Sequence, residues 1–305
     1  MRGVRNRALV TVVALAAGLL GAGSSQGADA PAAARPEAAP AAAGSCDTRS
    51  SLPPSRDESG SKIRAIKQRG KLIVGVDQNS YHWGYRNPQT GRIEGFDIDL
   101  AHAIAKALLG DPDKVVLKTV PTAKRIEAVQ NGDVDLIART MTITCDRLQQ
   151  VAFSVPYFSS GQRLVVPKSA HVTSVDQGLR GKRACAADQS SSQTELKANP
   201  HGTASVRIVA NQLDCLVLMQ LGEVDATLTD TTLAAAQTSQ DPTVELAGEQ
   251  IAPAYTGIAM KKENTDLVAR VNQVLADYRS DGGWQASYQH WLAASMGTDP
   301  TPYLP

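Results

Sequence analysis

From residue 62 onward, short apolar runs alternate with longer stretches in which apolar residues recur every three or four positions. The short runs are typical of buried strands, and the longer pattern is typical of amphipathic helices. The stretch 96–110 is an example, because its apolar residues fall on one helical face and Gly110 ends it. The same pattern predicts strands over 71–76, 114–120, 134–138, 163–168, 182–187, 206–210 and 224–229, and further helices over 123–132, 191–199, 212–222 and 231–237. Strands alternating with helices predict an α/β protein with largely parallel sheets.

One short pattern occurs twice. Residues 130–140 (QNGDVDLIART) and 220–230 (QLGEVDATLTD) align without a gap, with Gln, Gly, an acidic residue, Val and Asp in register. Each copy predicts the end of a helix, a glycine turn and a short strand. Thr140 and Thr142 then follow one strand, and Asp230 ends the other. Ligands of open α/β sheets bind at the carboxyl ends of strands, so two facing lobes would set an Arg/Thr cluster opposite a carboxylate. A zwitterion needs that arrangement of charges.

The segment after the first copy has the chemistry of a carboxylate site. Arg139, three threonines at every second position and Arg147 follow the predicted strand 134–138. A planar guanidinium binds a carboxylate through two parallel hydrogen bonds, and hydroxyl groups add donors. Thr144 is expected to be structural. The alternatives are that the arginine is a solvated surface charge and that Asp230 only caps the helix 231–237.

Composition and motifs narrow the function classes. The chain of 305 residues has 31 Lys and Arg against 30 Asp and Glu, so its net charge does not indicate nucleic acid or an acidic membrane. It has no nucleophile elbow, zinc-protease helix, phosphate-binding loop or dinucleotide fingerprint, and its five histidines lack metal-ligand spacing. We therefore expect a binding protein rather than an enzyme, with no catalytic residue, no cofactor and no metal.

The N-terminus has the layout of an export signal. A basic segment (MRGVRNR) precedes an apolar run (ALVTVVALAAGLLGAG) that is shorter than the roughly 20 residues of a membrane span. Small residues near 27–30 then predict cleavage, which makes 1–28 a signal peptide. The Ala/Pro-rich residues that follow cannot form a core, so 29–61 is predicted to be a disordered tether. The protein is expected outside the cell or associated with the cell envelope.

Export makes disulfides the expected state of the four cysteines. Their even number and positions favour Cys46–Cys145 and Cys185–Cys215. The alternative is that Cys46 carries a lipid anchor, because small residues precede it. However, Cys46 lies far from the apolar run, and lipidation would leave Cys145 unpaired.

Four segments together resemble the bacterial extracellular solute-binding proteins for polar amino acids. They are KLIVGVD, IEGFDIDLAHAIAKAL, VQNGDVDLIARTMTITCDRLQQVAFSVPYF and VDATLTDTTLAA, and the similarity covers roughly 62–293. The paired cysteines look most like those of actinobacterial glutamate-binding proteins. The resemblance implies a two-lobed, periplasmic-binding-protein-like (type II) clamshell. It divides the chain into a first lobe (62–165 and 257–293), a second lobe (166–256) and a C-terminal tail (294–305), with crossing strands near 163–168 and 254–260.

The resemblance also implies a ligand set. Arg147 would clamp the ligand α-carboxylate, aided by Thr140 and Thr142, and Asp230 would accept hydrogen bonds from the α-ammonium. Ser190 and Ser191 would close over the ligand from the second lobe, although relatives often carry glycines there. Asn211 would add a polar contact, and Trp83 and Phe96 would cover the ligand's aliphatic stem.

Arg125 indicates the kind of ligand. It begins the helix after the strand 114–120, so it is expected at the same edge as Thr122. A cation at a helix start interacts unfavourably with the helix dipole, which indicates that Arg125 has another role. The alternative is that it is a solvated surface charge. In acidic-amino-acid binders the matching arginine meets the side-chain carboxylate, and Arg139 is a second, weaker candidate. These cations favour glutamate or aspartate over asparagine and glutamine.

The expected partners follow from the family. The protein would act as a monomer that delivers its ligand to the permease of an ABC-type importer. One alternative is a ligand-sensing subunit that signals through a membrane receptor without transport. A second is an enzyme similar to cyclohexadienyl dehydratase, which would need a general acid in the cleft.

Overall fold

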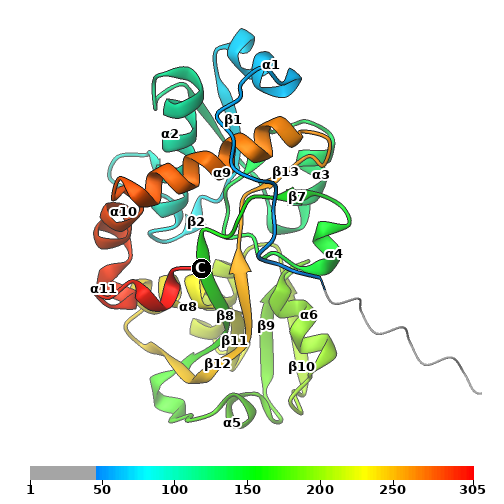
Figure 1. Cartoon of the computed structure of the whole chain (residues 1–305). Coiled ribbons are helices and arrows are strands. Elements are labelled where there is room, and N and C mark those ends of the chain that lie inside the picture. Colours follow the sequence, from blue (N-terminus) through cyan, green and yellow to red (C-terminus); the bar gives the residue numbers. More distant parts are fainter. Residues whose placement is uncertain (1–45) are drawn as a thin grey trace, which may run out of the picture. The chain divides into compact units, whose positions relative to one another are not determined.

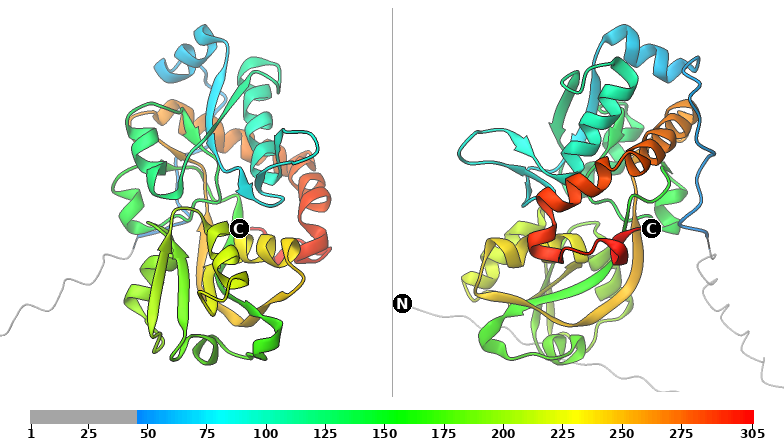
Figure 2. Two further views of the ribbon diagram at one scale, coloured as in Figure 1. Left: turned by 180° about the vertical axis from the view of Figure 1, so that it is seen from behind. Right: turned by 60° about the vertical axis from the view of Figure 1, so that its left-hand side comes forward.

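Two five-stranded sheets organise residues 46–305, the part of the chain that the computed structural model describes (Figure 1). The predicted signal peptide, its cleavage site and residues 29–45 of the predicted tether lie outside the described residues. Each sheet belongs to one lobe, and Figure 2 shows the two lobes from further sides. Between residues 46 and 305, none of the helices combines the length and apolarity that a membrane span requires.

The first lobe is built on the sheet with strand order β5-β1-β6-β13-β7. Strands β5, β1 and β6 are parallel, whereas β13 is antiparallel to both of its neighbours. The strands are β1 (Leu72–Val76), β5 (Val115–Thr119), β6 (Leu136–Ile137), β7 (Ala152–Phe153) and β13 (Ala259–Met260). The helices are α1 (Ser61–Arg69), α2 (Phe96–Leu109), α3 (Arg125–Gln130), α4 (Cys145–Leu148), α9 (Thr265–Ser280), α10 (Gly283–Trp291) and α11 (Ala293–Met296). A small antiparallel sheet joins β2 (Asn79–Ser80), β3 (Gly84–Arg86) and β4 (Ile93–Glu94).

The second lobe is built on the sheet with strand order β10-β9-β11-β8-β12. Strands β10, β9 and β11 are parallel, and β8 and β12 are antiparallel to their neighbours. The strands are β8 (Phe158–Pro167), β9 (Arg183–Ala187), β10 (Ser205–Val209), β11 (Ala226–Asp230) and β12 (Val244–Thr256). The helices are α5 (Val175–Leu179), α6 (Ser191–Ala198), α7 (Gln212–Gln220) and α8 (Thr231–Gln240). Three short 3-10 turns are described along the chain: η1 (Thr122–Lys124) follows β5, η2 (Lys168–Ala170) follows β8 and η3 (Thr301–Tyr303) follows α11. The mixed α/β, two-lobed fold expected from the sequence is therefore confirmed.

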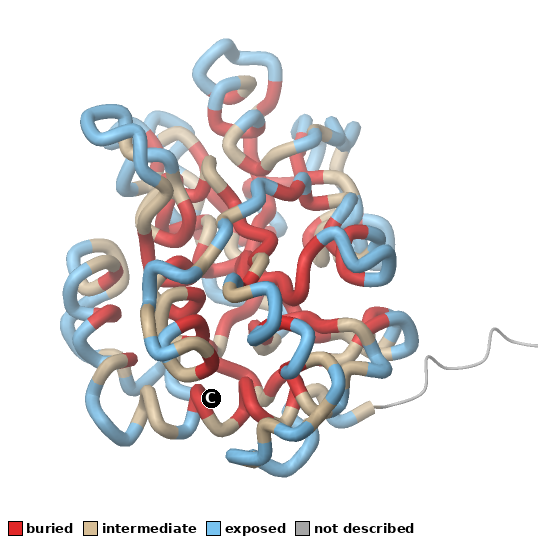
Figure 3. Tube along the Cα trace, turned by 90° about the horizontal axis from the view of Figure 1, so that it is seen from above, coloured by how far each residue is buried: buried red, intermediate tan, exposed pale blue. Residues whose placement is uncertain are grey.

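Central strands such as β1 and β9 are buried, which explains their apolar sequences, whereas the edge strands β5 and β10 are largely exposed. Val74 and Leu136 pack on one face of the first sheet, whereas Ile137 packs on the other. Leu164 and Val165 divide in the same way between the two faces of the second sheet. Parallel sheets covered by helices on both faces have this pattern. Figure 3 shows the buried segments gathered inside the molecule and the exposed ones at its rim.

The first crossing between the lobes comes earlier in the chain than the sequence indicated. All of β8 belongs to the second sheet, where it pairs with β11 and β12, so the predicted boundary at residue 165 is wrong. The crossing lies near 154–158 and runs beside the second crossing at 256–258: the Ser154 N–H donates to the Ile258 carbonyl at 2.9 Å, and the Tyr157 N–H to the Thr256 carbonyl at 2.9 Å. The polar start of β8 obscured the strand, although Ser160 and Gln162 are buried in it.

The predicted tether is also wrong between residues 46 and 61. Cys46 forms a disulfide with Cys145, so a lipid anchor on its sulfur is not compatible with this structure. The Ser51 hydroxyl then donates to the Phe153 carbonyl at 2.7 Å, and the Asn272 side-chain amide donates to the Leu52 carbonyl at 2.7 Å. This segment is therefore part of the first lobe. The second predicted disulfide, Cys185–Cys215, joins β9 to α7.

Candidate ligand-binding site between the lobes

A cavity lined by residues of both lobes lies where the carboxyl ends of the parallel strands from the two sheets meet. Ligands of open α/β sheets bind at such edges. The first lobe contributes residues that follow β1, β5 and β6, and the second contributes residues at or after β9, β10 and β11. The lining residues are Asp77, Thr122, Arg125, Arg139, Thr140, Thr142, Arg147, Ala187, Ser190, Ser191, Ser192, Gln212, Thr229, Asp230 and Leu233.

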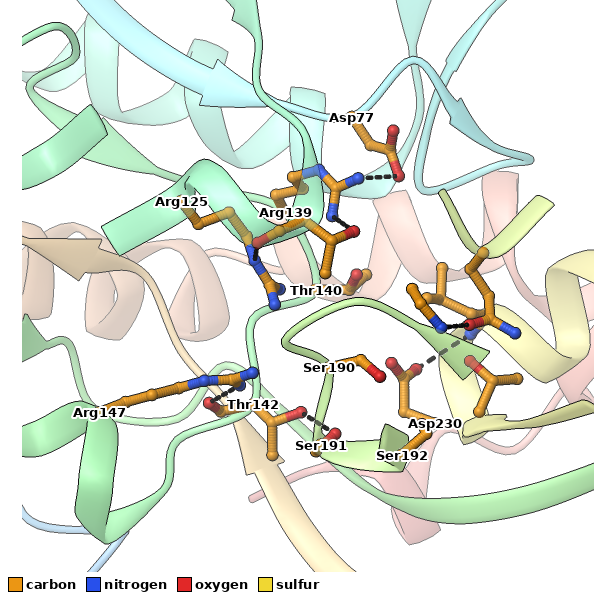
Figure 4. A pocket seen from close by; sticks show the side chains of 15 residues that line it. Asp77, Arg125, Arg139, Thr140, Thr142, Arg147, Ser190, Ser191, Ser192 and Asp230 are labelled. Carbon is orange, nitrogen blue, oxygen red and sulfur yellow. Dashed lines mark hydrogen bonds and ion pairs between the residues drawn. The ribbon is translucent and has the colours of Figure 1, made fainter. Parts of the chain in front are cut away.

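Arg147 lies at the hinge end of this cavity and connects the two lobes. Its guanidinium donates to the Thr142 carbonyl at 2.7 Å and, across the cleft, to the Gln189 carbonyl at 2.9 Å. Thr144 caps α4 by accepting from the Arg147 N–H at 3.3 Å, which confirms its structural role. Burial lowers the pKa of Arg147 to about 10, so the side chain still carries its charge at neutral pH. In Figure 4 its guanidinium points toward the space between the lobes.

The predicted threonines line the cavity beside it. Thr140 has a left-handed backbone with φ of 40°, which an L-residue rarely adopts, and its N–H donates to Asp97 Oδ2 at 2.8 Å. The Thr142 hydroxyl lies 3.1 Å from the Ser191 hydroxyl of the second lobe. The loop after β6 therefore provides both a turn in the wall and a contact between the lobes.

Arg125 and Arg139 occupy the other end of the first-lobe wall and differ in their partners. Arg139 Nη2 lies 3.1 Å from Asp77 Oδ2, and its Nη1 donates to the Thr122 hydroxyl at 3.0 Å. Arg125, by contrast, forms one described hydrogen bond, from Nε to the Thr122 carbonyl at 2.9 Å. Figure 4 shows its guanidinium pointing into the cavity. Burial, followed by the like charges of Arg147 and Arg139, lowers the pKa of Arg125 well below its usual range.

Helix starts form the wall of the second lobe. Asp230 caps α8, since its Oδ1 accepts from the N–H groups of Thr232 and Leu233 at 3.0 Å each and from the Thr232 hydroxyl. Burial raises the pKa of Asp230, and the bonds from Thr232 and Leu233 act against that rise. Ser190 caps α6 by accepting from the Gln193 N–H at 3.1 Å. Asp230 and Ser190 therefore each cap a helix and also line the cavity.

The first residues of α6, which follow the loop 188–190, are held by a side chain on β8. Gln162 donates to the Ser191 hydroxyl at 3.1 Å and accepts from the Ser192 hydroxyl at 2.6 Å. Gln189 takes the left-handed conformation, with φ of 53°, that glycines adopt more readily. The absence of glycine in this loop is therefore accommodated by one non-glycine residue with positive φ.

Three predicted contacts do not line this cavity. Trp83 and Phe96 are 1% and 0% exposed, and their rings pack against each other at 5.3 Å in the core of the first lobe. Asn211 begins α7, where its N–H donates to Asp214 Oδ2 at 3.2 Å. The lining includes no aromatic side chain from residues 46–305, so the expected aromatic cover of the ligand stem is not provided by Trp83 or Phe96.

Other lining residues were not singled out from the sequence. Gln212 replaces its neighbour Asn211, with its Oε1 accepting from the Ala187 N–H at 3.2 Å. Asp77 directly follows β1, and an acidic residue after a buried parallel strand is a signal that could have identified it. Thr229, Leu233, Ser192 and Ala187 carry no comparable signal, because their neighbours in sequence look the same.

The charges of the cavity are unequal. Three arginines face two aspartates, and one arginine, Arg139, is already paired with one aspartate, Asp77. Arg125, Arg147 and Asp230 remain to interact with a ligand. A buried charge is stable only when it is paired, so this wall is complementary to two anionic groups and one cationic group.

Comparison with known proteins agrees with this architecture. The family model for bacterial extracellular solute-binding proteins, family 3, matches residues 72–294. The ABC transporter glutamine-binding protein GlnH of Bacillus subtilis is 34% identical over 78% of this chain and 87% of its own. The glutamate-binding protein GluB of Corynebacterium efficiens is 26% identical over 79% and 84%. The solute receptor for L-cysteine of Neisseria gonorrhoeae has a TM-score of 0.75 at 28% identity, covering 80% of this chain and 99% of that one. The chain therefore belongs to the bacterial extracellular solute-binding proteins of family 3.

Proposed function

We propose that this protein binds an acidic amino acid, glutamate or aspartate, and delivers it to the permease of an ABC-type importer. The ligand would occupy the cavity between the lobes, outside the cell membrane. Its α-carboxylate would meet Arg147, and its α-ammonium would meet Asp230. Since these two residues belong to different lobes, both ends of the ligand are bound only when the lobes are closed.

The unpaired charge of Arg125 is the observation that carries the proposal. Its guanidinium is buried and lies near two other arginines, and its single described hydrogen bond goes to a carbonyl. A side-chain carboxylate on the ligand would pair with it through charge-assisted hydrogen bonds. A ligand with a neutral amide would leave the cation without an anionic partner.

The relatives support an amino acid and an importer but differ in the side chain. One is named for glutamine and ABC transport, and another for glutamate, at lower identity. Sequence similarity therefore leaves the choice between amide and acid open. The charge of the cavity favours the acid.

Titration calorimetry of the exported protein with glutamate, aspartate and glutamine tests this specificity. We expect glutamate or aspartate to bind at least about tenfold more tightly than glutamine, since a charged hydrogen bond contributes about 1.5–3 kcal/mol. The Arg125→Met variant should lose this preference and still bind neutral amino acids. Equal or tighter binding of glutamine by the wild type would contradict the acidic specificity.

Lys124→Met is the matched control for this variant. It removes the same charge one residue earlier, but Lys124 is exposed and pairs with Glu127 at 2.7 Å on the surface. The control should keep the wild-type preference. If both variants lose it equally, the effect of Arg125 is not local to the cavity.

A further inference from the structure

We propose that Asp97 is a positioning residue of the binding site, whose ionised carboxylate holds the loop after β6 in the conformation that binds ligand. The inference requires only that an amino acid binds in the cavity. It rests on the proposed function to that extent and is independent of whether the ligand is an acid or an amide.

Asp97 lies behind the cavity wall and contacts two segments that are distant in sequence. It belongs to the first turn of α2 and is 2% exposed. Its Oδ2 accepts from the Thr140 N–H at 2.8 Å, and its Oδ1 accepts from the Tyr157 hydroxyl at 2.7 Å. Thr140 lines the cavity, and Tyr157 lies in the first crossing segment between the lobes. One carboxylate therefore connects the binding loop to the hinge.

The backbone of Thr140 needs such a partner. Its φ of 40° is unfavourable for a β-branched residue and persists only when the surroundings impose it. The bond to Asp97 does so, because it fixes the direction of the Thr140 N–H. The same loop continues to Thr142, whose carbonyl accepts from Arg147 and whose hydroxyl contacts Ser191. A change at Thr140 would displace these groups together.

The charges around Asp97 couple its ionisation to the ligand. Burial raises the pKa of Asp97 to about 7, the bonds from Tyr157 and Thr140 lower it, and the carboxylates of Asp77 and Asp230 raise it further. A ligand ammonium beside Asp230 would offset that repulsion, so binding should lower the pKa of Asp97. Ligand affinity should therefore fall as the pH falls through about 7, where the free protein takes up a proton.

Tyr157 and Arg147 do not change their protonation state in that pH range. Burial raises the pKa of Tyr157 well above its usual value, so it remains a hydroxyl donor. Burial lowers the pKa of Arg147 only to about 10. The guanidinium groups of Arg125 and Arg139 also face the cavity.

Affinity and stability measured at two pH values test the role of Asp97. Wild-type affinity for glutamate should fall roughly fivefold between about pH 8 and about pH 5.5. Asp97→Asn imitates the protonated acid: its carbonyl can still accept from Thr140, but its amide must donate toward Tyr157. The variant should bind about fivefold more weakly than wild type at about pH 8, with little further change at low pH. Its melting temperature at pH 8 should be higher, since a buried charge has been removed.

Asp99→Asn is the matched control. Asp99 lies two residues further along the same helix and accepts from Ser287 and Trp291 at 2.7 and 2.8 Å, outside the cavity. Its variant should keep the affinity and pH profile of the wild type. Tyr157→Phe adds a test that keeps Asp97: losing the Tyr157 bond should raise the pKa of Asp97 and move the affinity midpoint to higher pH.

Two results would overturn the inference. One is an Asp97→Asn protein with wild-type affinity and an unchanged pH profile. The other is parallel loss of stability and affinity in that variant, because a residue that only supports the fold would behave in this way. If glutamine proves to be the preferred ligand, the acidic specificity is contradicted, and the same measurements with glutamine still decide the role of Asp97.

Discussion

Residues 130–140 of the first lobe and 220–230 of the second form the same local structure and then diverge at their last residues. In both, a helix ends at a glycine with positive φ, 77° at Gly132 and 70° at Gly222. In both, an aspartate then joins the next strand of its sheet. The Asp135 N–H donates to the Ile73 carbonyl at 2.8 Å and its carboxylate accepts from the Ile73 N–H, and Asp225 makes the same pair of bonds with Arg183.

The strand ends of the two copies have opposite chemistry. The first leaves its strand through Arg139 and Thr140, in a wall that carries the cations, whereas the second ends on Asp230, which caps α8 and carries negative charge. The shared residues build the scaffold, and the residues after them determine which charge reaches the cavity. An amino acid carries both charges, so the proposed ligand would meet cations of the first lobe and Asp230 of the second.

Loss of Arg147, a cation of the first-lobe wall, should have the largest effect on ligand affinity. Arg147→Ala should weaken glutamate binding by more than about 100-fold, because removing one partner of a buried charge pair costs 2–5 kcal/mol or more. Arg147→Lys should not restore it, since an ammonium cannot reproduce the planar fork. Titration calorimetry measures both. Binding within tenfold of wild type in either variant would place the α-carboxylate elsewhere.

Loss of the second-lobe charge should have the next largest effect. Asp230→Asn should weaken binding about 10- to 100-fold while preserving the melting temperature, because asparagine is as good a helix cap as aspartate. Asp230→Ala should lose affinity similarly and also about 1 kcal/mol of stability, through loss of the α8 cap. A stability loss in the asparagine variant equal to that of the alanine variant would show that Asp230 acts mainly as a cap.

Substitution of the two equivalent aspartates, Asp135 and Asp225, should lower the stability of the protein by different amounts and leave ligand affinity unchanged. Asp135 is buried and pairs with Lys62 at 2.7 Å and with Arg69, so Asp135→Ala should lower the free energy of unfolding by about 2 kcal/mol. Asp225 pairs with the more exposed Arg183, and Asp225→Ala should cost about 1 kcal/mol or less. Urea unfolding compares them. An equal loss of unfolding free energy in the two variants would mean that the greater burial of Asp135 does not make its ion pairs more stabilising.

The direct contact between the lobes should have the smallest effect. Thr142→Val and Ser191→Ala each remove one hydroxyl of the 3.1 Å pair across the cleft. Each substitution should weaken ligand binding about two- to fivefold, because a hydrogen bond that replaces bonds to water contributes about 0.5–1.5 kcal/mol net. The double variant should lose no more than the larger single effect, as expected for partners in one bond. Additive losses would indicate that each hydroxyl contacts the ligand separately.

The sequence by itself determined the order of the elements and much of the first-lobe wall. Apolar periodicity depends on local geometry, and it located the parallel strands of both sheets and the helices between them. It did not identify β12, α9 or α10. The positions of Arg147, Thr140 and Thr142 could be inferred because they follow a strand whose carboxyl end must lie at a ligand-binding edge. The even cysteine count predicted disulfides, and the pairing chosen is the one in the structure.

The tertiary structure decided which of several equivalent neighbours reaches the cavity. Asn211 and Gln212 are one residue apart, but only the second lines it, because side-chain direction at the start of α7 depends on how that helix packs. Trp83 and Phe96 turn into the core for a similar reason: burying two large rings among other aromatics stabilises the lobe more than exposing them in a polar cleft. The contact of Asp97 with Thr140 joins residues 43 positions apart. No local pattern encodes such a contact, since it forms only when a helix and a strand-end loop from different parts of the chain are packed together.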